Sequence, residues 1–128
     1  MAFTHTIKEE VLTGDGAVSG QFAYSTEAQT TLSVSVPAAS TDLQVLVNID
    51  VSQVKSFYLL SDKDLTVETN SPSAPTNTIS LKANKPYIWH TDEYSTFKLT
   101  ADVTSLYLTN AGAAAATLEM RVLFDPTP

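Results

Sequence analysis

The chain has 128 residues and a mass of 13.8 kDa, a length typical of one domain. It contains no cysteine, which excludes disulfides, iron–sulfur clusters, thiolate zinc sites and cysteine nucleophiles. Fourteen acidic residues against seven Lys and Arg give a net charge of −7, and such a surface repels nucleic-acid phosphates and anionic lipid headgroups. We therefore expect neither a nucleic acid nor a membrane as a partner.

The N-terminal segment alternates weakly, with His5, Ile7 and Glu9 on one side. This pattern predicts that residues 1–13 form an edge strand or an arm that pairs with a neighbour. Two glycines in Thr-Gly-Asp-Gly, residues 13–16, predict a tight turn. The segment lacks the basic start and apolar stretch of a signal peptide, so we expect the chain to be a cytosolic product when it is made.

Strands are predicted along the rest of the chain, because apolar and polar residues alternate with a period of two. The alternation covers residues 18–25, 31–36, 43–51 and 117–124. In the last of these, Leu118, Met120 and Val122 are predicted to face inward, whereas Arg121 and Leu123 are predicted to face outward.

A short polar turn, Ser-Asp-Lys-Asp at residues 61–64, separates two further strands over residues 54–60 and 65–69 and predicts a hairpin. The one extended loop, residues 70–77, contains two prolines. Composition favours strands as well, since the chain is rich in Thr and Val, which branch at Cβ.

The predicted fold is therefore all-β. We expect a single β-sandwich or jelly-roll-like domain of about nine to eleven short, mostly antiparallel strands. It is predicted to cover residues 14–125, with residues 126–128 as an extended tail, because Pro126 and Pro128 cannot continue a ladder.

Candidate catalytic residues are few. His90 lies close to Asp92 and Glu93, and these three would be the natural members of a metal or acid–base cluster. However, neighbouring residues of a strand point to opposite faces, which argues against that cluster.

A calcium loop would need more than Asp62, Asp64 and Glu68, which lack the further oxygen ligands and the central glycine. The sequence also contains no Gly-x-Ser-x-Gly elbow around a nucleophilic serine. We therefore predict no catalytic, cofactor-binding or metal site, and a protein that is not an enzyme.

Three aromatic residues, Tyr87, Trp89 and Tyr94, form a candidate interaction surface. Such side chains stack on sugar rings in carbohydrate-binding sandwiches, and they also pack in cores and subunit contacts. Both interpretations remain open at this point.

The second half of the chain carries a resemblance to a known class of proteins. It rests on the succession Val54–Asp62, Leu65–Asn70, Ile79–Trp89, Leu106–Gly112 and Ala116–Asp125. Over about residues 45–125, in its general residue pattern and in the order of its strands, the chain resembles small all-β virion structural proteins of tailed bacteriophages, especially capsid decoration (cement) proteins.

This resemblance implies a non-enzymatic protein of the virion. Decoration proteins bind the outside of an icosahedral capsid, often as trimers, and stabilise the shell by clamping neighbouring capsomers. The implied location is the virion, assembled in the host cytoplasm. The implied partners are the major capsid protein or another virion protein, and further copies of the chain in a homo-oligomer. A tail or neck component and a carbohydrate-binding module are the alternatives.

Overall fold

The computed structural model describes residues 3–26 and 28–125, so the expected tail at residues 126–128 lies outside the described residues. The described chain forms ten strands and one short 3-10 turn, η1 (Val51–Gln53). This confirms the all-β prediction. The same residues contain no helix with the length and hydrophobicity that a membrane span requires.

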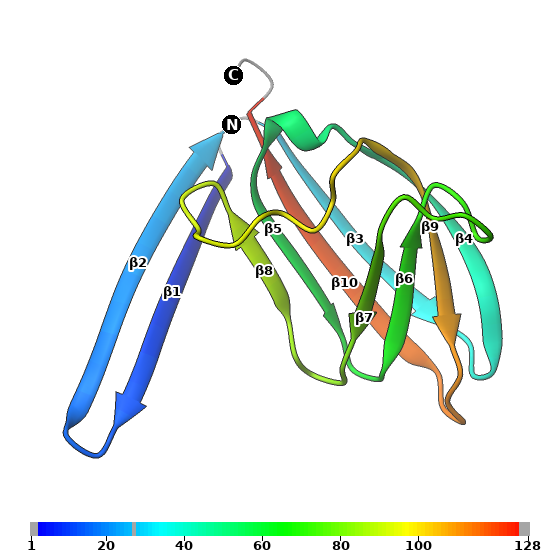
Figure 1. Ribbon diagram of the computed structural model, residues 1–128, viewed down its shortest axis with the longest axis horizontal. Helices are drawn as coiled ribbons and strands as arrows, with labels where there is room; N and C mark the ends of the chain where they lie inside the picture. The colour runs from blue at the N-terminus through cyan, green and yellow to red at the C-terminus, as the bar shows by residue number, and fades with distance from the viewer. Residues whose placement is uncertain (1–2, 27, 126–128) are drawn as a thin grey trace.

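Eight of the strands form a sandwich of two four-stranded sheets (Figure 1). In spatial order, the first sheet contains β3 (Ala28–Val36), β10 (Ala116–Phe124), β5 (Val54–Ser61) and β8 (Tyr87–His90). The second sheet contains β4 (Ser40–Ile49), β9 (Val103–Asn110), β6 (Leu65–Thr69) and β7 (Thr78–Leu81). Every pair of neighbouring strands is antiparallel.

The pairing of these strands is nested along the chain. β3 pairs with β10, β4 with β9, β5 with β8 and β6 with β7. The sandwich therefore follows one long antiparallel ribbon that is rolled up, so that successive pairs fall alternately in the two sheets. This is the topology of an eight-stranded jelly roll, and it confirms the predicted fold class.

The hairpin predicted around residues 61–64 is wrong, because β5 and β6 belong to different sheets. The turn residues hold other segments instead. Asp62 accepts a hydrogen bond from the backbone N–H of Thr117 at 2.8 Å, and Asp64 accepts one from Ala83 at 2.9 Å. A turn sequence marks where the chain changes direction, but it does not say which strand is the next neighbour.

The core lies between the two sheets, and the alternation of β10 explains how it is filled. Leu118, Met120 and Val122 are buried against the second sheet, as the sequence predicts. Leu123 is predicted to face outward and is nevertheless completely buried, on the outer face of the first sheet. Its burial shows that another element covers this face.

That element is a hairpin that stands apart from the sandwich (Figure 1). It consists of β1 (Phe3–Thr13) and β2 (Gly16–Thr26), which pair only with each other among the described strands and contact the outer face at β10. Gly16 has φ 140°, which favours glycine, in the turn that the sequence predicts. We call this hairpin the arm. The predicted arm of residues 1–13 thus has a second strand, and the sandwich begins at β3.

Candidate functional site

The outer half of the arm is open to solvent. Every side chain described between Lys8 and Gln21 is exposed, including Val11 at 63% and Leu12 at 75%. An antiparallel strand of 11 residues is about 37 Å long, so the arm extends well beyond its attachment. An isolated two-stranded hairpin is only marginally stable in water. An arm with apolar residues at its end is therefore suited to packing against another protein.

His5 makes the first attachment of the arm to the sandwich. Its Nε2–H donates to Gln29 Oε1 on β3 at 2.7 Å, and its Nδ1 accepts from the hydroxyl of Ser56 on β5. Ser56 is buried, although it lies on the outer face beside Leu123. The root of the arm thus covers the first sheet and satisfies its buried polar groups.

His90, at the end of β8, makes the second attachment and is only 1% exposed. The Tyr24 hydroxyl donates to Asp92 Oδ2 at 2.8 Å, so its oxygen accepts from His90 Nδ1–H at 2.9 Å. Burial and the hydrogen bond to Asp92 raise the pKa of Tyr24, which keeps its proton at neutral pH. The ring of Phe22 lies 4.6 Å from the His90 ring, centroid to centroid.

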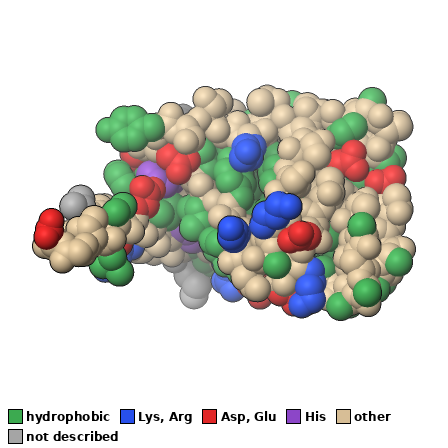
Figure 2. Space-filling model, turned by 60° about the horizontal axis from the view of Figure 1, so that its bottom comes forward, with side chains coloured by type: hydrophobic (Ala, Val, Ile, Leu, Met, Phe, Trp, Pro, Cys, Tyr) green, Lys and Arg blue, Asp and Glu red, His purple; other side chains and the backbone are tan. Residues whose placement is uncertain are grey.

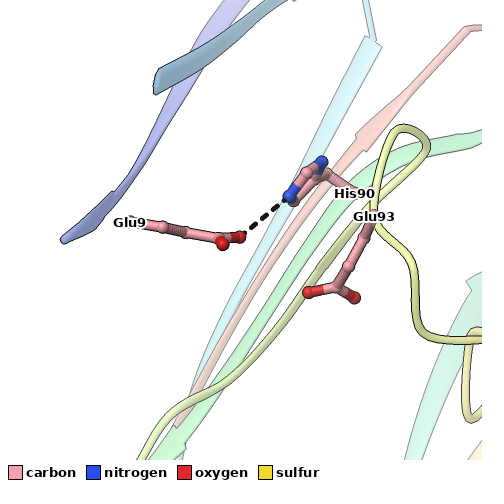
Figure 3. Close-up of side chains that lie close together, drawn as sticks. All are labelled: Glu9, His90 and Glu93. Atoms are coloured by element: carbon pink, nitrogen blue, oxygen red, sulfur yellow. Dashed lines mark hydrogen bonds and ion pairs between the residues drawn. The ribbon is translucent and has the colours of Figure 1, made fainter. Parts of the chain in front are cut away.

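The other nitrogen of His90 faces two carboxylates (Figure 3). Glu9 Oε1, from the arm, lies 3.2 Å from His90 Nε2, and Glu93 follows in the loop after β8. One ligand atom from each of the three residues lies within 4.8 Å of the others, an arrangement that can hold a metal ion.

The structure therefore brings His90 and Glu93 together, with Glu9 rather than Asp92 as the third residue. The argument from alternation does not apply here, because β8 ends at His90 and residues 91–93 follow it as a turn. Sequence reasoning missed Glu9 and Tyr24, which are 81 and 66 residues away from His90 along the chain. No local pattern could have paired them.

An open groove of about 510 Å³ runs between β1 and the outer face of the first sheet. Ile7, Tyr58, Ile88 and Arg121 contribute to its lining. Figure 2 shows the arm projecting from one end of the molecule, with acidic side chains along it and histidine side chains where it meets the body. The groove thus combines apolar side chains such as Ile7 and Ile88 with polar ones and with two cations, Lys8 and Arg121.

The candidate interaction surface is divided between the core and solvent. Trp89 stacks on Phe97 at 4.4 Å and its Nε1–H donates to Ser95 O, whereas Tyr87 packs against the core and accepts a hydrogen bond from Lys98 N. Burial raises the pKa of Tyr87. Only Tyr94 presents its whole ring to solvent. A joint surface of Tyr87, Trp89 and Tyr94 stays a prediction, and Tyr94 is its one fully accessible member.

Comparisons of the chain with protein-family models, with curated proteins and with solved structures found no match.

Proposed function

We propose that this chain is a non-enzymatic structural protein of a phage particle, which binds the outside of the capsid as a decoration protein and stabilises the shell. The observation that supports this function most is the arm, with Val11 and Leu12 exposed near its end. A tail or neck component is the alternative that would use the same arm.

The arm offers two kinds of contact to a neighbouring protein. Full burial of a Val or Leu side chain is worth about 1.5–3 kcal/mol, so Val11 and Leu12 together are a substantial anchor. The outer edges of β1 and β2 also have backbone groups that no strand of the described chain pairs. Such edges can extend a neighbour's sheet by strand addition.

The body of the protein suits the outer surface of a shell. A net charge of −7 is unfavourable next to packaged DNA and is compatible with a solvent-facing position. Jelly rolls are common in viral capsid proteins, although they also occur in lectins and cupins. The fold therefore supports the proposal only by analogy, and the arm supports it by its own chemistry.

Further copies of the chain are the proposed partners of the groove. Ile7 and Ile88 give the groove an apolar wall, and Arg121 has no ion-pair partner among the residues that the structure describes. The end of the arm has the complementary character, with apolar Leu12 on β1 and acidic Asp15 in the turn that follows. The arm of one copy placed in the groove of the next is a head-to-tail contact, which gives a ring when the rotation between copies closes, and a trimer is the expected form.

Binding of the purified chain to capsids that lack it tests this function. Co-sedimentation should be saturable for the wild type and strongly reduced for the Val11→Ser/Leu12→Ser variant. Leu46→Ser is the matched control, because Leu46 is as exposed as Leu12, at 76%, but lies on β4 of the sandwich. Light scattering should give a particle mass several times 13.8 kDa for the wild type.

Equal binding by the arm variant and the Leu46 control would contradict a role for the arm. Saturable binding to tails, with none to capsids, would contradict the capsid location and support the tail or neck alternative.

A further inference from the structure

We infer that Glu9, His90 and Glu93 form a binding site for one divalent metal ion of the zinc class at the junction of arm and sandwich. The three residues offer one imidazole nitrogen and two carboxylate oxygens, within 4.8 Å of one another. Zn²⁺ takes nitrogen and carboxylate ligands of this kind. The inference does not depend on the proposed function.

The positions of the protons around His90 are the first argument. Because the Tyr24 hydroxyl donates its hydrogen bond to Asp92, its oxygen accepts from His90 Nδ1–H, and Nε2 is the ring nitrogen left to meet the carboxylates. His90 Nε2 lies 3.2 Å from Glu9 Oε1, and Glu9 is its only hydrogen-bond partner in the described part of the chain. A metal ion bound here would take the place of the proton that this hydrogen bond holds, because metal ligands bind in their deprotonated form.

Distances are the second argument. Tetrahedral Zn²⁺ with bonds of about 2.0–2.2 Å places its ligand atoms about 3.3–3.6 Å apart. The separation of 3.2 Å between Glu9 Oε1 and His90 Nε2 is already close to this value. Glu93 is half-buried on the loop after β8, and one of its carboxylate oxygens already lies within 4.8 Å of the other two ligand atoms (Figure 3). A water molecule would take the fourth position.

The groups behind His90 are the third argument. A metal-binding histidine usually donates its other N–H to an acceptor that fixes the tautomer and the ring orientation. Here Nδ1–H donates to Tyr24, which donates in turn to Asp92, and Phe22 packs on the ring. These contacts hold Nε2 in position toward the carboxylates. A chance group of acidic side chains on a surface has no such fixed ligand atom.

Metal binding at this position would join two parts of the molecule. Glu9 belongs to the arm, whereas His90 and Glu93 belong to the sandwich. The ion would therefore fix the angle at which the arm leaves the body.

Calorimetric titration of the full chain with ZnCl₂ and with MgCl₂, after removal of metals by a chelator, tests this site. We expect one Zn²⁺ per chain and much weaker binding of Mg²⁺, which prefers six oxygen ligands. Glu93→Gln should weaken Zn²⁺ binding at least tenfold. Glu10→Gln is the matched control, because Glu10 follows Glu9 on the same strand, faces the other side and pairs with Lys8. It should bind Zn²⁺ like the wild type.

A nitrogen-15 NMR spectrum of the wild type provides a second measurement that needs no variant. On addition of Zn²⁺, His90 Nε2 should take the chemical shift of a metal-bound nitrogen. The inference is overturned if Zn²⁺ does not bind saturably, if Glu93→Gln and Glu10→Gln bind alike, or if His90 Nε2 carries a proton that Zn²⁺ does not displace. If the wild type binds Zn²⁺ but does not bind capsids, the proposed function is contradicted and the metal site is not.

Discussion

Replacement of Tyr24 by phenylalanine tests how the arm is held to the sandwich. The change removes one hydroxyl and two hydrogen bonds, to His90 Nδ1 at 2.9 Å and to Asp92 at 2.8 Å. Asp92 is exposed, so water replaces its lost donor at little cost. His90 is 1% exposed, so its Nδ1–H loses its acceptor in a buried position, which costs about 1–3 kcal/mol. The population of molecules with a detached arm should rise about 5-fold to 150-fold.

Hydrogen exchange of the backbone amides in the β1–β2 ladder measures this opening, because a detached two-stranded hairpin is only marginally stable and its ladder amides then exchange. Protection in the ladder should fall by the stated factor in Tyr24→Phe, while protection in β9 and β10 at the centres of the two sheets stays the same. Tyr94→Phe is the matched control, because Tyr94 is fully exposed, and it should leave both unchanged. If both variants exchange like the wild type, the hydrogen bond between Tyr24 and His90 does not hold the arm.

Three further predictions concern the sandwich and the tyrosines. Val34→Asp should prevent folding because it places a charge against the core, whereas Ser35→Lys should change the free energy of unfolding by less than about 0.5 kcal/mol. Thermal melts measure both, and the reverse result would mean that the register of β3 is shifted by one residue. Leu123→Ala should cost about 2–5 kcal/mol in urea unfolding, because Leu123 is completely buried, and a cost below about 0.5 kcal/mol would mean that the outer face is open. Burial is the main cause that raises the pKa values of Tyr24 and Tyr87 above their usual 10.0. The stability that these neutral side chains contribute is therefore fully present below pH 10, and it is lost as the pH rises through the raised pKa values. Thermal melts above pH 10 should show a smaller alkaline loss for a Tyr24→Phe/Tyr87→Phe variant, and an equal loss would contradict this.

Local patterns were sufficient to predict the fold class. Alternation along β10 identified Leu118, Met120 and Val122 as core residues, because a strand between a core and solvent imposes a period of two on its sequence. The same rule placed Leu123 outside, since it describes one buried face only. Its burial depends on the arm, which the alternation of β10 does not encode.

Long-range pairing was not predictable in the same way. The turn at residues 61–64 was visible, but the strand that lies next to β5 was not, because β10 and β8 are distant in sequence. The site around His90 has the same origin. His90 and Glu93 are near each other in the chain, whereas Glu9 reaches them only because the arm packs against the outer face of the first sheet.

A cryo-electron microscopy map of the particle that carries this protein tests the proposed function most directly. We predict jelly rolls on the outer capsid surface, with Val11 and Leu12 of each arm buried against a neighbouring protein. Arms that end in solvent, or density for the chain only in the tail or neck, would contradict the proposal that the arm attaches a decoration protein to the shell.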